Sequence, residues 1–160
     1  MHIEPILHLL LMLVIANGTP VVTGLLFRER MAWPLDGGRQ FIDGRRLFGA
    51  SKTLRGIVMA VAASALLAPL IGLTTADGAL AGLLAMTGDL VSSFSKRRLG
   101  YQHGCASPLL DQLPESCLPL WVLAPATGAS LADMAAAVAA FTVLDLLVSR
   151  LYRPDQALCR

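Results

Sequence analysis

GDLVSSFSKRRLG, residues 88–100, is the stretch where a long apolar segment gives way to three consecutive cations. Asp89 follows mainly apolar residues, and a carboxylate inside a membrane is costly unless it faces a partner or a cavity. A helix through this stretch places Asp89, Ser93 and either Lys96 or Arg97 on one face. The stretch therefore predicts the cytoplasmic end of a membrane-spanning helix that carries a charged site.

The composition of the chain points to lipid surroundings. Hydrophobic residues make up 55% of the 160 residues and charged residues only 15%, whereas soluble domains average about 45–50% and about 25%. A chain of this length has room for one domain of about 100–200 residues. We therefore expect residues 1–160 to form a single integral membrane domain.

Five apolar segments approach the roughly 20 residues that a membrane-spanning helix needs. They are residues 6–26, 54–73, 77–95, 114–129 and 131–151. The fourth segment is short and contains Pro119 and Pro125, so a re-entrant segment is the alternative to a full crossing. The predicted fold is all-α, with about five transmembrane helices and long loops after the first and third spans.

The positions of the cations predict how the chain is oriented. All 13 Lys and Arg residues lie in or beside the segments 27–55, 96–113 and 150–160. Five spans with the N-terminus outside put all three segments on the cytoplasmic side, as the positive-inside rule requires. Four spans would export the C-terminal arginines, so the pattern favours a fourth crossing. We expect a protein of the cell inner membrane whose functional face is cytoplasmic.

The first predicted loop, PLDGGRQFIDGRRLFGASKTLRG at residues 34–56, has the composition of a phosphate site. Two Asp-Gly pairs, the second beginning at Asp43, predict tight turns. Lys52, Thr53 and Arg55 lie where the second span begins, and a helix N-terminus beside cations binds phosphate readily. A P-loop is excluded because Ser precedes Lys52 and no strand comes before it. The alternative is a solvated basic loop that rests on lipid headgroups.

Two carboxylates flank the second predicted loop, residues 96–113. Asp89 precedes the loop and Asp111 lies at its far end, so the two meet if the third and fourth spans pack side by side. Mg²⁺ is usually held by one or two carboxylates, with phosphates and waters completing its shell. Two acids, a ring of cations and a glycine-rich loop suit nucleotidyl transfer, which depends on positioning and charge neutralisation. An internal ion pair of Asp89 with Lys96 or Arg97 is the structural alternative.

GDLVSSFSKRRLG followed by LDQLPES resembles the CDP-archaeol synthase family, small membrane cytidylyltransferases related to phosphatidate cytidylyltransferase. The loop at 34–56 and the ANGTPV stretch of the first span are similar to that family too. The resemblance covers about residues 15–116. It implies a reaction that joins CTP to a lipid phosphate, releases pyrophosphate, requires Mg²⁺ and takes place on the cytoplasmic face.

The resemblance also assigns roles to individual residues. It implies that Asp89 and Asp111 bind the metal and that Asp89, Asp111 and Lys96 are catalytic. Substrate contacts are implied for Ser93 and Arg97, for the first-loop residues Asp43, Lys52, Thr53 and Arg55, and for Asn17 in the first span. The chain departs from the archaeal pattern at one place. Where those enzymes tend to have a second acid, this chain has Pro114, with Glu115 next.

Other classes of function remain open on the sequence alone. A non-enzymatic membrane module could bind anionic lipid or a partner through the basic face, and it would be indifferent to CTP. A small transporter could use Asp89 or Asp145 as an ion site. For the enzyme, the expected partners are CTP, a lipid phosphate and membrane lipid. No nucleic-acid partner is expected, and a homodimer is left open.

Overall fold

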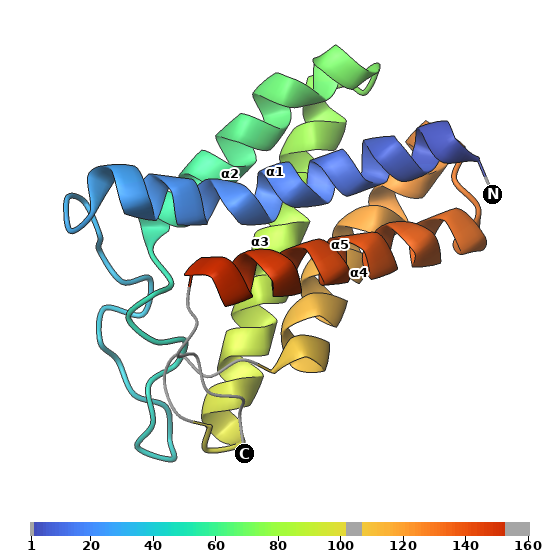
Figure 1. The fold of residues 1–160 in the computed structure, drawn as a ribbon. Coiled ribbons are helices and arrows are strands. Elements are labelled where there is room, and N and C mark those ends of the chain that lie inside the picture. Colours follow the sequence, from blue (N-terminus) through green and yellow to red (C-terminus); the bar gives the residue numbers. More distant parts are fainter. Residues whose placement is uncertain (1, 102–106, 153–160) are drawn as a thin grey trace.

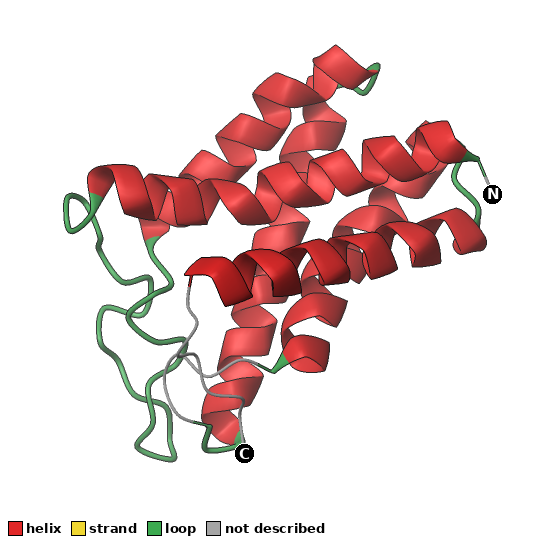
Figure 2. Ribbon diagram, in the orientation of Figure 1, coloured by secondary structure: helices red, strands yellow, loops and turns green. Residues whose placement is uncertain are grey.

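The computed structural model describes residues 2–101 and 107–152. Arg153 and Arg160, which entered the charge pattern, lie outside these ranges. The elements within them are helical: α1 (Ile3–Phe27), α2 (Leu54–Leu67), the short 3₁₀ helix η1 (Ala68–Ile71), α3 (Thr75–Arg98), α4 (Pro108–Thr127) and α5 (Leu131–Tyr152). Two isolated β-bridges lie in the first loop. The all-α prediction is confirmed over the described chain (Figures 1 and 2).

Four of these helices are long and apolar enough to cross a membrane: α1, Leu54–Ile71, α3 and Leu131–Arg150 of α5. Five spans were predicted, and four of them coincide with these candidate spans. The remaining helix, α4, begins at Pro108 rather than near residue 114. Proline is tolerated in the first turn of a helix because its missing N–H would be unpaired there. The early start adds the polar residues Asp111 and Gln112 to the helix and lowers its hydropathy.

The end of α3 differs from the prediction. The cations at 96–98 were expected to open the second loop, but they form the last turn of α3. Positive side chains are favourable at a helix C-terminus, where the carbonyl groups carry partial negative charge. Arg45 Nη1 donates hydrogen bonds to the carbonyl oxygens of Arg97 and Arg98, at 3.2 and 2.9 Å. The first loop therefore caps the end of α3.

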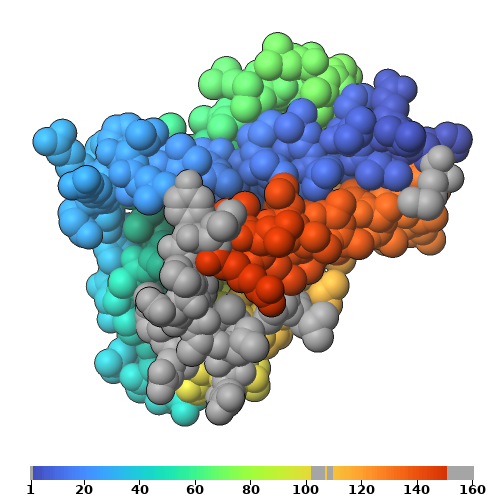
Figure 3. Space-filling model, viewed as in Figure 1, coloured from blue at the N-terminus to red at the C-terminus, as the bar shows by residue number. Residues whose placement is uncertain are grey.

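Close backbone contacts fix α3 against its two neighbours. A Cβ atom on Gly78 would lie 2.3 Å from the carbonyl oxygen of Ser64 in α2. A Cβ atom on Gly88 would lie 2.2 Å from the carbonyl oxygen of Pro114 in α4. Only glycine permits such approaches. The residue that precedes Asp89 is thus a point of close backbone approach between α3 and α4, and in the view of Figure 3 α1 and α5 lie at the front of the bundle.

The outer surface of the bundle is apolar, as a lipid-facing surface must be. Large hydrophobic side chains are exposed on each candidate span, among them Leu26 (72% exposed), Leu66 (74%), Leu83 (49%) and Val143 (58%). A soluble protein rarely leaves so continuous an apolar surface open to water. The surface therefore agrees with the membrane assignment that length and hydropathy give.

The N-terminus lies at the end of the bundle opposite the first loop (Figure 1). The backbone N–H of His2 donates a hydrogen bond of 2.9 Å to Asp133 Oδ1, at the start of α5. Asp133 Oδ2 also accepts hydrogen bonds from the backbone and hydroxyl of Ser130. The start of the chain and the α4–α5 turn consequently lie at one end, the arrangement that the charge pattern predicts for an outside face.

Candidate functional site

The first loop is organised around one buried carboxylate, Asp36. Its Oδ1 accepts hydrogen bonds from Arg46 Nη2 (2.7 Å) and the backbone of Gly38 (2.9 Å). Its Oδ2 accepts from the backbone of Phe48 (3.3 Å) and Gly49 (3.0 Å). Burial alone would raise the pKa of Asp36, but these hydrogen bonds outweigh it and hold the pKa well below 3.8. The sequence showed the Asp-Gly-Gly turn but did not single out this residue.

The two predicted turns are confirmed, and the second docks the loop onto α3. Gly37 and Gly44 adopt positive φ angles of 53° and 74°. Asp43 Oδ1 accepts a hydrogen bond from the backbone of Arg45 (3.1 Å) and forms an ion pair with Arg98 Nη1 (2.6 Å). The Arg98 guanidinium also lies 4.8 Å from the ring centre of Phe94. Asp43, expected to contact substrate, thus positions the loop.

Asp36→Asn is expected to open the first loop. Breaking a buried charge pair costs about 3–5 kcal/mol, and the lower figure applies because the Arg46 side chain is 34% exposed. Trypsin should cut the loop arginines about tenfold faster or more, because proteolysis follows the population of the open loop. Asp77→Asn, the same change in the capping box of α3, should leave this cleavage unchanged. If trypsin cuts the two variants at equal rates, Asp36 does not organise the first loop.

The same carboxylate sets the acid sensitivity of the loop. The folded pKa of Asp36 lies below its ordinary value of 3.8, so its stabilisation is fully present above that value. The stabilisation is lost as the pH falls from about 4 through the folded pKa. The protection of the backbone amides of Gly38 and Gly49 from hydrogen exchange, relative to the unfolded chain at the same pH, should therefore stay high down to about pH 4 and fall in stronger acid.

Two lysine–aspartate pairs bring the ends of α2, α3 and α4 together. Lys52, just before α2, places its Nζ 2.6 Å from both Oδ1 and Oδ2 of Asp89. Lys96, in the last turn of α3, places its Nζ 2.6 Å from Asp111 Oδ1. The four side chains are between 14% and 28% exposed. They are partly withdrawn from water yet reachable by a charged ligand.

A fifth charged residue, Glu115, belongs to this cluster and was missed as a site residue. It interacts electrostatically with Asp89, Asp111, Asp145 and Lys52. The residue one helical turn after Asp111 shares its face of α4, so the spacing of four residues was the available signal. The contact of α3 with α4 then brings that face to Asp89. Glu115 therefore links the two lysine–aspartate pairs into one charged site.

The neighbouring turn of α4 connects this site to α5. Gln112 Nε2 donates a hydrogen bond of 2.6 Å to Asp145 Oδ2. Asp145, which the transporter alternative would use as an ion site, is thus a hydrogen-bond partner that joins α5 to α4.

Three other predicted site residues make local structural contacts. The hydroxyl of Thr53 accepts a hydrogen bond of 3.2 Å from the backbone of Gly56 and caps the N-terminus of α2. Arg55 Nη1 donates to the carbonyl oxygens of Arg28 and Arg30, beyond the end of α1. Asn17 Nδ2 donates to the carbonyl oxygen of Leu13 in its own helix, at 3.2 Å. Each contact stabilises a helix end or a helix.

Ser93 lies on α3 between Asp89 and Lys96, and Arg97 directly follows Lys96. Ser93 is only 5% exposed, and Arg97 belongs to the last turn of the helix. Because α3 is continuous from Asp89 to Lys96, the predicted shared face is present. The structure therefore brings Lys52, Asp89, Lys96 and Asp111 to one site.

The donor set fits a metal that arrives with its substrate. In the part of the chain that is described, no group of three or more His, Cys, Asp or Glu side chains is arranged to hold a metal ion. Mg²⁺ needs only one or two carboxylates when phosphates and waters supply its other ligands. Asp89 and Asp111 meet that requirement, although lysine ammonium groups now lie against both.

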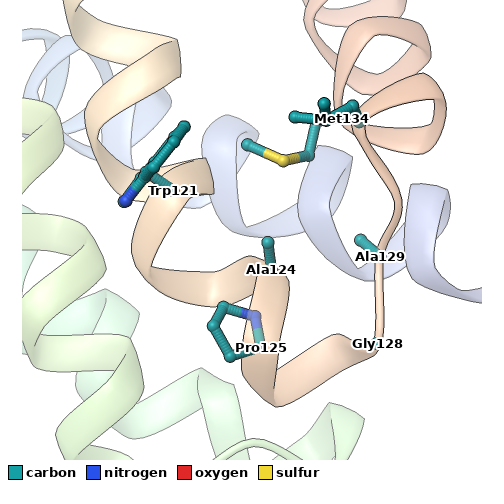
Figure 4. Close-up of a pocket in the computed structure, with 7 residues that line it drawn as sticks. Trp121, Ala124, Pro125, Gly128, Ala129 and Met134 are labelled. Atoms are coloured by element: carbon teal, nitrogen blue, oxygen red, sulfur yellow. The ribbon is translucent and has the colours of Figure 1, made fainter.

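A separate hollow of about 520 Å³ lies between the end of α4 and the start of α5 (Figure 4). It is lined by Trp121, Ala124, Pro125, Gly128, Ala129, Leu131 and Met134. None of these side chains is titratable, and the hollow lies at the end of the bundle that holds the N-terminus (Figure 1). It offers apolar surface but no group that could bind phosphate.

Comparison with known proteins gives one consistent result. A family model described as CarS-like, CDP-archaeol synthase, matches residues 3–151. A CDP-archaeol synthase of Hyperthermus butylicus is 38% identical over 104 residues, which cover 61% of this chain and 59% of that protein. One from Methanopyrus kandleri is 45% identical over 86 residues, or 50% of each chain.

A third relative and a solved structure agree with these. A CDP-archaeol synthase of Aeropyrum pernix is 42% identical over 111 residues, which cover 66% of this chain and 60% of that protein. The matched segments thus span between 50% and 60% of the length of these relatives. A solved structure of an intramembrane enzyme for archaeal membrane lipids biosynthesis has a TM-score of 0.75 and 35% identity, covering 89% of this chain and 90% of that one.

Proposed function

The chain belongs to the CDP-archaeol synthase family, and from that membership we propose that it transfers the cytidylyl group of CTP to a lipid phosphate. The observation that carries the proposal is the pair of lysine–aspartate contacts where α3 and α4 meet. They place two anions for a metal and two cations for phosphate at the same point. Nucleotidyl transfer requires both, and it requires no nucleophilic side chain.

The side chains divide the work of this reaction by charge. Asp89 and Asp111 hold Mg²⁺, which when bound offsets the charge of the CTP phosphates. Lys52 and Lys96 bind the phosphate oxygens and stabilise the negative charge that develops on the departing pyrophosphate. The attacking group is an oxygen of the lipid phosphate, which forms a bond to the α-phosphorus of CTP as the bond to pyrophosphate breaks. Arg97 attracts both anionic substrates to the site.

The placement of the site in the membrane follows from the same proposal. With the charged end of the bundle in the cytoplasm, CTP approaches from water and the lipid phosphate from the inner leaflet. This orientation makes α4 a full crossing, because it runs from the charged end to the end that holds the N-terminus (Figure 1). The sequence-derived topology of five crossings, with the N-terminus outside, is retained as part of the proposal.

The substrate lipid is proposed as a chemical class, a lipid phosphate, and not as one compound. The names of the relatives point to an ether-linked isoprenoid lipid phosphate as the first candidate. A diacyl lipid phosphate has the same headgroup and fits the same charged site. The apolar outer surface of the bundle favours a long-chain substrate of either kind.

The test is pyrophosphate release by the detergent-purified protein. CTP and Mg²⁺ are supplied with phosphatidate, digeranylgeranylglyceryl phosphate or a polyprenyl phosphate in separate reactions. We expect release that requires CTP, Mg²⁺ and one of these lipids, with ATP as the matched nucleotide control. If no lipid supports release and CTP does not bind, the proposal fails and a lipid-binding module becomes the better account of the basic face.

A further inference from the structure

We propose that Lys52 and Lys96 are internal counter-ions that occupy the two carboxylates until a nucleotide arrives, so that CTP must bind before or together with the metal. This inference rests on the proposed function. It adds an order of binding and gives the two lysines a second role, in the state without substrate. The geometry of each ion pair carries it.

At Asp89, the ammonium group of Lys52 stands where a metal would stand. Its Nζ is 2.6 Å from both carboxylate oxygens. That symmetric position is the one taken by a cation that a carboxylate holds through both oxygens. A divalent cation can therefore reach Asp89 only if Lys52 moves or if the two cations share the carboxylate at short range. The second arrangement is unfavourable because like charges repel.

At Asp111, both carboxylate oxygens are also engaged. Oδ1 is 2.6 Å from Lys96 Nζ. Oδ2 accepts a hydrogen bond of 3.1 Å from the backbone N–H of Ser107, which precedes α4. The second predicted metal ligand, Asp111, is therefore also occupied by a lysine ammonium group, in this case between α3 and α4.

The phosphate groups of a nucleoside triphosphate are better partners for the two lysines than the carboxylates are. A lysine ammonium is a point charge on a flexible stem with three donors, so it can turn from one anion to another nearby. Once the phosphates take Lys52 and Lys96, the oxygens of Asp89 and Asp111 are available to a metal that the same phosphates bring. Nucleotide and metal then strengthen each other's binding, and by linkage the factor is the same in both directions.

The partial burial of the pairs makes this exchange effective. The Lys52 and Asp89 side chains are 24% and 25% exposed, so the ion pair is less screened than one at the surface. It is still open enough for phosphate to reach it. Glu115 also interacts electrostatically with Lys52 and lies beside this pair.

The test measures Mn²⁺ binding, by electron paramagnetic resonance, to the detergent-purified full chain. We expect the wild-type protein to bind Mn²⁺ about tenfold more tightly with α,β-methylene-CTP than without it, within the usual range of coupling between sites. Lys52→Met should bind Mn²⁺ about tenfold more tightly than wild type without nucleotide, because Asp89 is no longer occupied. The same variant should bind the nucleotide analogue more weakly.

Two control variants separate the ion pair from general charge effects. Lys52→Arg keeps a cation on Asp89 and should bind free Mn²⁺ as weakly as wild type. Arg39→Met removes one positive charge from the same loop at an exposed side chain that forms no hydrogen bond or ion pair with described residues, and it should also match wild type. If Lys52→Met does not fold, Lys96→Met applies the same test to Asp111.

The outcomes distinguish this inference from the proposed function. If the analogue binds but leaves Mn²⁺ affinity unchanged, or if Arg39→Met gains as much Mn²⁺ affinity as Lys52→Met, the counter-ion role is overturned and the cytidylyltransferase proposal stands. If the wild-type protein binds no analogue at all, both proposals fail. Tighter Mn²⁺ binding in Lys52→Met alone, together with weaker analogue binding, supports the exchange.

Discussion

Asp89→Asn is expected to lower CTP-dependent pyrophosphate release by about a thousandfold or more while the protein stays folded. The amide has nearly the shape of the carboxylate but carries no charge, so it neither holds a divalent cation well nor forms an ion pair with Lys52. Rate constants for pyrophosphate release, measured at saturating CTP and lipid phosphate, give the size of the effect. Each tenfold loss corresponds to about 1.4 kcal/mol of transition-state stabilisation.

Folding of the Asp89→Asn protein is checked separately. Its unfolding midpoint in detergent should stay within a few degrees of wild type, because the side chain is 25% exposed and the amide oxygen can still accept a hydrogen bond from Lys52. Asp77→Asn makes the same substitution near the opposite end of α3 and should retain turnover. Wild-type turnover in Asp89→Asn would exclude a metal-binding role for this residue.

Gly88→Ala is expected to have the largest effect on the fold. The added Cβ would lie 2.2 Å from the carbonyl oxygen of Pro114 and 2.6 Å from the nitrogen of Glu115. Backbone atoms cannot turn aside as a flexible side chain can, so α3 and α4 must separate. Overpacking of this kind costs about 1–3 kcal/mol, and sometimes more. The separation also moves Asp89 away from Asp111 and Glu115, so turnover should fall with stability.

A second glycine supplies the matched control for this substitution. Gly24 in α1 has no atom within 4 Å of an added Cβ, so Gly24→Ala should leave both properties unchanged or raise stability slightly, since alanine favours helix more than glycine does. Thermal unfolding in detergent and pyrophosphate release are measured on both variants. Equal behaviour of the two would show that α3 and α4 are not held together at Gly88.

The sequence predicted the features that depend on local pattern. Hydropathy located the four candidate spans, since each apolar run coincides with a continuous helical segment, and it gives no such candidate at α4, where polar residues share the helix with apolar ones. Asp89 and Asp111 could be singled out because a carboxylate is conspicuous beside apolar residues. That the two lie where α3 and α4 meet could be predicted only on the condition that these helices pack side by side.

The remaining features depend on how distant segments meet. Glu115 joins the site because Gly88 lets α4 approach α3 at that register, and no local pattern encodes the register. The side chains of Thr53 and Arg55 suit phosphate binding and helix-end contacts equally well, since both roles use the same donors and acceptors. The structure assigns them the helix-end contacts.

The glycine contacts of α3 also separate two requirements on this protein: the spacing of its charged groups and the fit of its outer surface to the bilayer. The spacing of the charged groups is fixed by main-chain atoms touching main-chain atoms, at Gly78 against Ser64 and at Gly88 against Pro114. The side chains that meet the lipid take no part in that spacing. Descendants of such a chain can therefore exchange their outer residues to suit bilayers of another thickness or chemistry, while the arrangement of the charged groups is inherited unchanged.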